Sequence, residues 1–174
     1  RDNHAAVEKI IDYTDIMFNN IVQDYNGVIR GVVGDAYLVT FNKIENLADS
    51  LEYIYKFWNN AYKKEKLLRL RLGIHKGQML LYRRFCGGES FNASAFLESS
   101  GKFTDEYNNK ENITITHVSE HIKNDLVAIN SSYKNNLNKV SKAELIKNKC
   151  PDRLYEGLKS KFKSTYIFSP ISQY

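Results

Sequence analysis

Asp35 is the acidic residue whose sequence setting best suits metal chemistry. It follows Gly34 between two apolar runs, Val28–Val33 and 36–41, so a tight hairpin would place its carboxylate at the end of a sheet. Gly34 permits a positive φ and lets a ligand approach the backbone closely. A carboxylate placed there can hold a divalent cation such as Mg²⁺, which in turn holds phosphate oxygens. The Gly-Asp pair is also ordinary turn chemistry, so both interpretations stay open.

Two further groups of polar residues could contact a phosphorylated ligand, and a third pair is expected only to be exposed. Asn92 lies one turn into an expected helix, where its amide could donate to a ribose or phosphate oxygen or serve only local hydrogen bonding. Arg83 and Arg84 precede a Gly-Gly pair and form the best local phosphate-binding pair, or a charged surface. His75 and Lys76 lie in an expected turn, where we expect them to be exposed.

These residues must be positioned by alternating helices and strands. Apolar spacing and end signals predict helices over 5–22, 44–66, 89–100 and 119–129, the last capped by Ser119. The predicted strands are 28–33, 36–41, 68–74, its return strand 78–82, 113–116 and 165–168. Residues 104–112 read as polar loop, and 131–152 have no clear pattern. The order predicts an α+β fold in which one mixed sheet is flanked by helices.

Composition narrows the class of protein. The 174 residues, 43% of them hydrophobic, predict one domain over 1–174 with a real core and exclude a disordered chain. No run of 18 apolar residues occurs, so we expect no membrane span. Cys86 and Cys150 are too few for a disulfide framework, which favours a reduced, cytoplasmic protein. The net charge of +5 is scattered along the chain, so we expect a solvated basic surface and no nucleic-acid partner.

Three blocks in order resemble the motifs of class III nucleotidyl cyclases, the family of adenylate and guanylate cyclases. Residues 27–41 (GVIRGVVGDAYLVTF) resemble the family's hairpin with its Gly-Asp tip. Residues 70–77 (LRLGIHKG) resemble its strand and turn, and 88–99 (GESFNASAFLES) resemble its asparagine-bearing helix. Residues 113–119 (ITITHVS) fit the strand before the last main helix. The resemblance runs from about residue 7 to residue 126.

The resemblance implies a fold, a reaction and a set of roles. The fold would be a ferredoxin-like βαββαβ core. A nucleoside triphosphate would be converted to a 3′,5′-cyclic nucleotide and pyrophosphate with two divalent cations, Mg²⁺ or Mn²⁺, in sites shared by a head-to-tail homodimer. Asp35 would be a metal ligand and Asn92 the residue that orients the ribose. The expected substrate contacts are Arg30, Gly31, Gly34, Tyr37, Arg83 and Arg84.

Two departures concern the catalytic machinery. The family's second metal-binding aspartate lies on a strand before the first helix, which would fall ahead of Arg1, so we expect it in preceding sequence unless the domain lacks it. Phe96 occupies the position of the family's transition-state arginine. A phenyl ring cannot neutralise phosphate charge, so Arg83, Arg84 or Lys76 would have to substitute.

A third departure concerns the base. Gly31 and Phe85 occupy the positions where the family reads a purine. The chain therefore resembles the pyrimidine cyclases of the bacterial anti-phage system Pycsar, which make cyclic UMP or cyclic CMP as second messengers. A UTP or CTP cyclase is the leading hypothesis. The alternatives are an adenylate cyclase making cyclic AMP and a degenerate cyclase-like domain with a regulatory binding role; a diguanylate cyclase fits the order of elements poorly.

Overall fold

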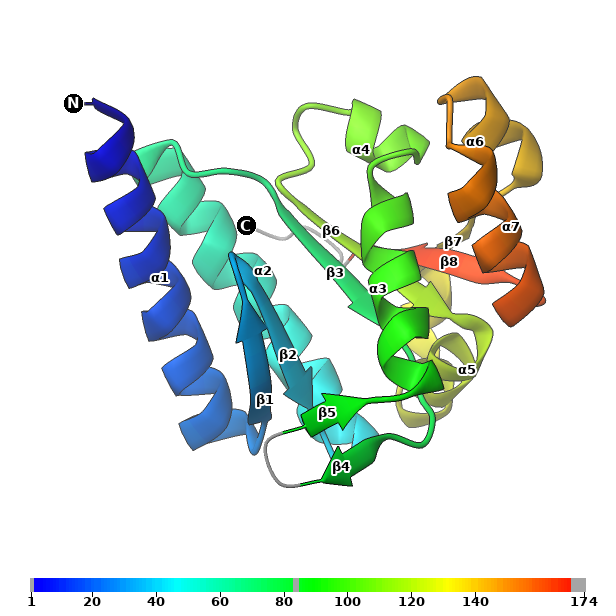
Figure 1. Ribbon diagram of the computed structural model, residues 1–174, viewed down its shortest axis with the longest axis horizontal. Helices are drawn as coiled ribbons and strands as arrows, with labels where there is room; N and C mark the ends of the chain where they lie inside the picture. Colours follow the sequence, from blue (N-terminus) through cyan, green and yellow to red (C-terminus); the bar gives the residue numbers. More distant parts are fainter. Residues whose placement is uncertain (1, 83–84, 170–174) are drawn as a thin grey trace. The chain divides into compact units, whose positions relative to one another are not determined.

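Two long helices and a hairpin make up the first of two units into which the chain divides, Arg1–Arg69 and Leu70–Tyr174. The structure is a computed structural model that describes residues 2–82 and 85–169 (Figure 1). Each unit has its own strands and its own buried side chains. The single domain expected from the chain length stays a prediction. No described helix is long and apolar enough to cross a lipid bilayer.

In the first unit, α1 (Asp2–Tyr25) leads into β1 (Val28–Val33), which pairs antiparallel with β2 (Ala36–Thr40), and α2 (Ile44–Glu65) follows. The apolar residues of α2 recur every three or four positions, which gathers them on one buried side of the helix. The buried apolar residues of the two helices are Met17, Phe18, Ile21, Leu47, Ala48, Leu51, Ile54, Trp58 and Ala61.

Aromatic side chains join α1 to α2. The rings of Tyr25 and Tyr53 stack with centroids 5.3 Å apart, and those of Tyr13 and Phe57 lie 6.1 Å apart in a tilted pair. Such pairs add to the free energy gained from burying their area. The two helices therefore have a packed interface of their own within the first unit.

The second unit alternates strands with shorter helices. Its elements are β3 (Leu70–Ile74), β4 (Leu80–Tyr82), β5 (Phe85–Gly87), α3 (Glu89–Gly101), α4 (Asp105–Asn108), β6 (Thr114–Ser119), α5 (Glu120–Ile129), the 3₁₀ helix η1 (Ser131–Asn136), β7 (Leu137–Lys139), α6 (Lys142–Lys147), α7 (Asp152–Lys161) and β8 (Thr165–Phe168).

A mixed four-stranded sheet with the order β3-β6-β8-β7 forms the centre of this unit (Figure 1). β3 and β6 are parallel, while β8 is antiparallel to both β6 and β7. All six residues of β6 are buried, as expected for a strand with neighbours on both edges and both faces. Gly73 allows α3 to lie directly on β3, because a Cβ there would collide with the backbone at Ser94 and Glu98.

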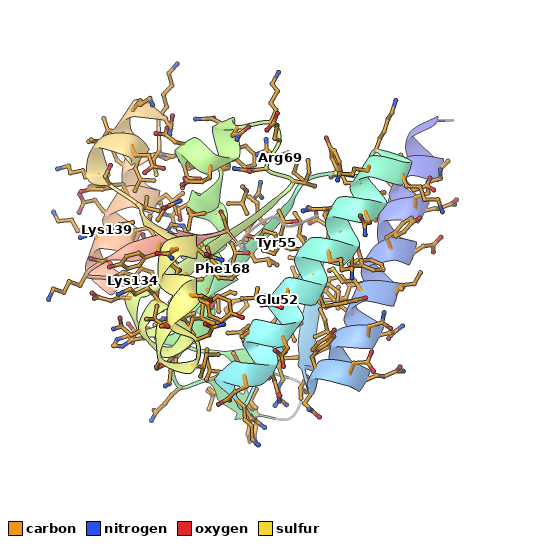
Figure 2. All side chains as sticks on the ribbon, turned by 180° about the vertical axis from the view of Figure 1, so that it is seen from behind. Glu52, Tyr55, Arg69, Lys134, Lys139 and Phe168 are labelled. Atoms are coloured by element: carbon orange, nitrogen blue, oxygen red, sulfur yellow. The ribbon has the colours of Figure 1, made fainter. Side chains whose placement is uncertain are left out.

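The core of the second unit lies between the sheet and the helices α3, α6 and α7. Its buried members are Leu97, Ile115, Val140, Leu145, Leu158 and Ile167, and partly buried Phe96, Phe103, Tyr107, Tyr155 and Phe162 pack against them. Phe168, labelled in Figure 2 among the side chains of this unit, is almost fully buried and meets Tyr133 edge-on at 5.6 Å. The C-terminal segments are thus part of this core.

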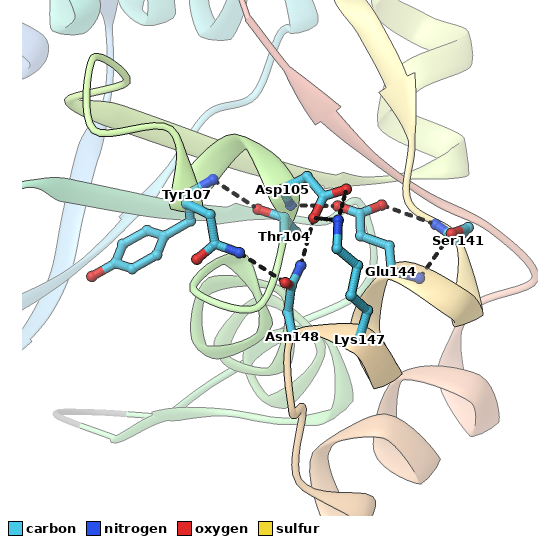
Figure 3. Close-up of polar contacts among 8 residues, drawn as sticks. Thr104, Asp105, Tyr107, Ser141, Glu144, Lys147 and Asn148 are labelled. Atoms are coloured by element: carbon cyan, nitrogen blue, oxygen red, sulfur yellow. Dashed lines mark hydrogen bonds and ion pairs between the residues drawn. The ribbon is translucent and has the colours of Figure 1, made fainter.

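A polar cluster joins α4 to α6 (Figure 3). Ser141 and Glu144 form a capping box at the start of α6, and the Glu144 carboxylate also accepts the backbone N–H of Asp105 at 2.7 Å. The Asp105 carboxylate accepts hydrogen bonds from Asn148 at 2.8 Å and from Lys147 at 3.2 Å, and both lower its pKa. These hydrogen bonds tie α4 to both ends of α6.

Most predicted elements are confirmed. The first three helices, both strands of the first hairpin, the strand at β3 and the strand 165–168 lie where the sequence pattern places them, with ends shifted by a few residues. The expectation of a mixed sheet flanked by helices is also confirmed for the second unit. For the helices and strands, a strong local period decided the outcome.

Other expectations were wrong. The strand 78–82, expected to return along β3, is the shorter β4 and pairs with β5, while β3 pairs with the parallel strand β6. The hairpin β1–β2 is a separate two-stranded sheet among the described residues and does not join one common sheet. The polar loop 104–112 contains α4, and 131–152 holds η1, β7 and α6, which depend on tertiary contacts.

Candidate functional site

The hairpin tip has the geometry that the sequence predicts. Val33 pairs with Ala36, so Gly34 and Asp35 alone make the turn, and Gly34 has a φ of 62°. A glycine with positive φ at the first turn position matches the right-handed twist of the strands. Asp35 is exposed, so its carboxylate is free to meet a ligand from solvent.

The other predicted residues of the hairpin are held by neighbours within the first unit. The Tyr37 ring stacks on Phe18 with centroids 4.1 Å apart, and its hydroxyl donates to Asp15 at 2.8 Å. The Arg30 guanidinium donates to the Thr40 hydroxyl at 2.9 Å. Tyr37 and Arg30 thus have partners within the first unit, and their predicted contacts with substrate stay predictions.

Gly31 lies at an irregularity of the hairpin. The pairing between β1 and β2 shifts register between Ile29 and Gly31, which marks a bulge. A Cβ built on Gly31 meets no atom within 4 Å. The position therefore offers open space where a longer side chain would project.

Asn92 lies on α3 in the second unit and is exposed. Its backbone N–H donates to the carbonyl of Gly88, which closes the first turn of the helix. Asp35 and Asn92 thus belong to different units of the chain. Arg83 and Arg84, expected to contact phosphate, lie outside the described residues.

Phe96 packs inward on α3. Its ring lies against Gly157 of α7, where a Cβ would collide with three ring carbons, and the Lys161 ammonium is 5.9 Å from the ring centroid. Lys76, one of the cations expected to substitute for an arginine here, is paired with Asp125 at 2.8 Å. The cation nearest to Phe96 on α7 is therefore Lys161, which the sequence pattern did not single out.

A cavity of about 600 Å³ opens beside the N-terminus of α3. It is lined by residues from the segment after β3, from the start of α3 and from the end of α7, including His75, Gly77, Ser90 and Lys161. Its size falls within the range of small-molecule sites. Only the tertiary structure brings Lys161 to this place, so no local pattern could have found the cavity.

His75 is half-buried beside this cavity, which corrects the expectation of an exposed turn residue. Its Nδ1 lies 3.1 Å from the Ser119 hydroxyl, and its ring meets Phe162 edge-on at 5.3 Å. Ser119 precedes α5 as expected but makes no side-chain cap, because its hydroxyl faces His75 instead. Burial, followed by the nearby His121, lowers the pKa of His75 below 6.5.

A second histidine is buried in the core of the same unit. His117 on β6 is fully buried, and its Nδ1 lies 3.1 Å from the Leu97 carbonyl and 2.7 Å from the Ser100 hydroxyl. Because a carbonyl oxygen only accepts, Nδ1 carries the proton. Burial lowers the pKa of His117 to about 4, so the ring is neutral at pH 7.

The described residues hold no cluster of three histidine, cysteine, aspartate or glutamate side chains. The exposed Asp35 carboxylate is still compatible with Mg²⁺, which keeps several waters and takes one or two carboxylates together with substrate phosphates. Comparisons with known proteins found no match: no family model, no curated protein and no solved structure is significantly similar to the chain.

Proposed function

We propose that the chain is a metal-dependent nucleotidyl cyclase that converts UTP or CTP to a 3′,5′-cyclic nucleotide and pyrophosphate. The observation that carries this proposal is where the three sequence blocks fall. Block 27–41 spans a hairpin with Gly34 and Asp35 at its tip, 70–77 spans β3 and the segment after it, and 88–99 lies almost wholly in α3. Each block thus has the element type that the resemblance implies.

Asp35 would hold the divalent cations together with the triphosphate oxygens. It is exposed on a turn whose glycine has the positive φ that close ligand approach favours. The bound cations would supply charge neutralisation and activation of the 3′-hydroxyl. This chain's own contribution is to position the triphosphate for in-line attack on the α-phosphate.

Asn92 would orient the ribose from a second protomer. It is exposed on α3, so its amide is open to a partner. Asp35 and Asn92 lie in different units of the chain, which suits a head-to-tail homodimer in which each protomer contributes one of them to a shared site. The proposal therefore predicts that mixing the Asp35 and Asn92 variants restores part of the activity.

The pyrimidine preference rests on Gly31. This residue lies in the bulge of the hairpin with open space around its Cβ position, so it supplies no side chain to contact a purine. A messenger role in anti-phage defence belongs to the same proposal. We place the protein in the cytoplasm on the grounds of its cysteine content.

A regulatory domain without turnover is the second candidate, and Phe96 favours it. The ring is packed against Gly157 of α7 and belongs to the core of the second unit. A packed aromatic ring cannot stabilise charge on a transferring phosphate as an arginine does. Under this candidate the chain binds nucleotide and signals through its partner.

The test is incubation of the full chain, as its gene encodes it, with Mn²⁺ or Mg²⁺ and each of the four nucleoside triphosphates. We expect a cyclic pyrimidine nucleotide by mass spectrometry, lost in Asp35→Ala and kept in Asp12→Ala, a control at an exposed aspartate of α1. If cyclic AMP is the only product, the substrate is ATP and the proposed pyrimidine preference is wrong. Nucleotide binding without product would favour the regulatory candidate, and neither binding nor product would refute both.

A further inference from the structure

We propose that the cavity at the N-terminus of α3 binds the phosphate group of a small phosphorylated molecule whose apolar body lies in the rest of the cavity. The cavity lies wholly within the second unit and contains neither Asp35 nor Asn92. The inference is therefore independent of the proposed cyclase activity. It rests on a helix terminus, a hydroxyl without a partner in the described part of the chain and a lysine, which line one cavity.

The first observation is the open helix terminus. The N-cap residue Gly88 has a φ of 117°, and no side chain caps α3. The first helical hydrogen bond runs from the Asn92 N–H to the Gly88 carbonyl, so the N–H groups of the first turn have no partner within the helix. These donors and the positive end of the helix dipole favour an anion.

The second observation is the hydroxyl of Ser90, which lies in that first turn and lines the cavity. The residue is only 9% exposed, and no other residue in the described part of the chain makes a hydrogen bond to this hydroxyl. Gly77 lies so close on the other side that a Cβ there would collide with the Ser90 oxygen. The buried side-chain N and O atoms that lack a partner among the described residues do not include this oxygen, so it is open to the cavity, where a ligand oxygen can form a hydrogen bond with it.

The third observation is the charge balance at the cavity. The Lys161 ammonium lies 3.8 Å from the Glu89 carboxylate, a separation longer than a good hydrogen bond. The Lys161 side chain is 21% exposed, whereas the Glu89 side chain is 85% exposed. Glu89 can therefore turn into solvent, which leaves Lys161 to pair with a bound anion.

Part of the remaining lining is apolar, beside the polar side chains of His75 and Gln78, and the cavity is larger than a phosphate needs. Met79, Leu80 and Ala93 contribute to the wall, and the cavity holds about 600 Å³. Small-molecule sites of this size combine apolar walls with a few polar groups that fix orientation. A phosphate held by the helix terminus and Lys161 would place an attached organic group against these side chains.

Calorimetric titration of the full chain with phenyl phosphate at low salt and without metal tests the proposal. Phenyl phosphate should bind more tightly than inorganic phosphate, and phenol should not bind. Lys161→Gln should weaken binding about tenfold and Ser90→Ala about threefold, in line with a charged and a neutral hydrogen bond. Lys159→Gln, at an exposed lysine of the same helix, should change nothing. Glu89→Gln should tighten binding, because it removes the competing carboxylate.

The proposal is overturned if phenyl phosphate does not bind, if Lys161→Gln and Ser90→Ala bind as Lys159→Gln does, or if Glu89→Gln weakens binding. Thermal unfolding checks each variant, and if Lys161→Gln does not fold, Ser90→Ala and Glu89→Gln decide. UMP identifies the source of the phosphate: tighter binding than phenyl phosphate points to a nucleotide, and weaker binding to another phosphate ester. Asp35→Ala should bind normally, so failure of the cyclase proposal would leave this result intact.

Discussion

The tip of the β1–β2 hairpin holds one exposed carboxylate on a two-residue turn, whereas the cavity beside α3 collects side chains from three separate segments. At the tip, Asp35 is free because nothing in the first unit packs over it. In the cavity, Ser90 and Lys161 are held by the packing of α3 and α7. The difference teaches that a single exposed carboxylate needs a metal ion or a partner to act, while the cavity brings groups of different chemistry together within one unit.

The largest effect is expected at the hairpin tip. Asp35→Ala should lower cyclase activity more than about 100-fold, since loss of even an outer partner of a metal ligand costs 10–100-fold. Product formation from UTP and CTP is the measurement. The same variant should keep its melting temperature and its affinity for phenyl phosphate. A variant with full activity would remove the tip from the reaction and leave the cavity as the remaining candidate.

The next largest effect is a loss of folding stability at acid pH. We expect it to come mainly from His117 in the core of the second unit. His117 has a pKa of about 4 in the folded chain, below its ordinary value of 6.5, so the unfolded chain binds the proton more tightly. The contribution of the neutral His117 ring to the free energy of unfolding is complete above pH 6.5. It is lost as the pH falls, and the loss is about 3 kcal/mol at pH 4.

Chemical unfolding at pH 7 and pH 4, with NMR titration of the histidine rings, measures this loss. His75, whose pKa is also lowered, acts in the same direction, and the NMR signals separate the two. A His117 ring that titrates near 6.5 would contradict the prediction. It would also mean that the core around β6 admits water.

Two glycine substitutions should separate the regions further. Gly77→Ala should destabilise the chain by about 1 kcal/mol, because its methyl group would collide with the Ser90 hydroxyl and force that side chain to move. It should also weaken phenyl phosphate binding. Gly31→Ala is the matched control in the hairpin, where a Cβ meets no atom within 4 Å, and its stability should stay close to that of the parent. Equal melting temperatures for both variants would show that the cavity wall is not rigid.

The smallest effect is the pH dependence of anion binding. Protonation of His75 adds a positive charge at the cavity, where Glu89, Lys161 and His121 also act on it. Since its pKa lies below 6.5, affinity should rise as the pH falls below that value, by about fivefold for an added charge worth on the order of 1 kcal/mol.

Sulfate is the probe for this measurement, because it keeps its charge over the range while a phosphate ester does not. His75→Gln should flatten the pH profile, and His121→Gln should keep its slope. If the slope disappears only with His121→Gln, then the proton is taken up at α5 and not beside β3. That result would assign the pH dependence of anion binding to His121 and not to His75.

Local sequence determined the elements with a strong period of their own. The helices α1, α2 and α3 follow from apolar spacing, and the β1–β2 hairpin follows from a Gly-Asp pair between two apolar runs. The position of Asp35 at an exposed turn could be predicted for the same reason. These features depend on contacts between residues close in the chain, which a sequence pattern records directly.

Tertiary structure decided what depends on residues far apart in the chain. The strand β3 pairs with β6, which follows more than twenty residues after β5, and the nearby strand β4 pairs with β5. The local sequence predicts a solvated turn residue at His75, whereas Ser119 and Phe162 contact its ring in the fold. Lys161 has no distinguishing local pattern, and the packing of α7 on α3 brings it to the cavity. Burial, partnership and charge at these sites come from packing between separate segments, and no local periodicity encodes which segments meet.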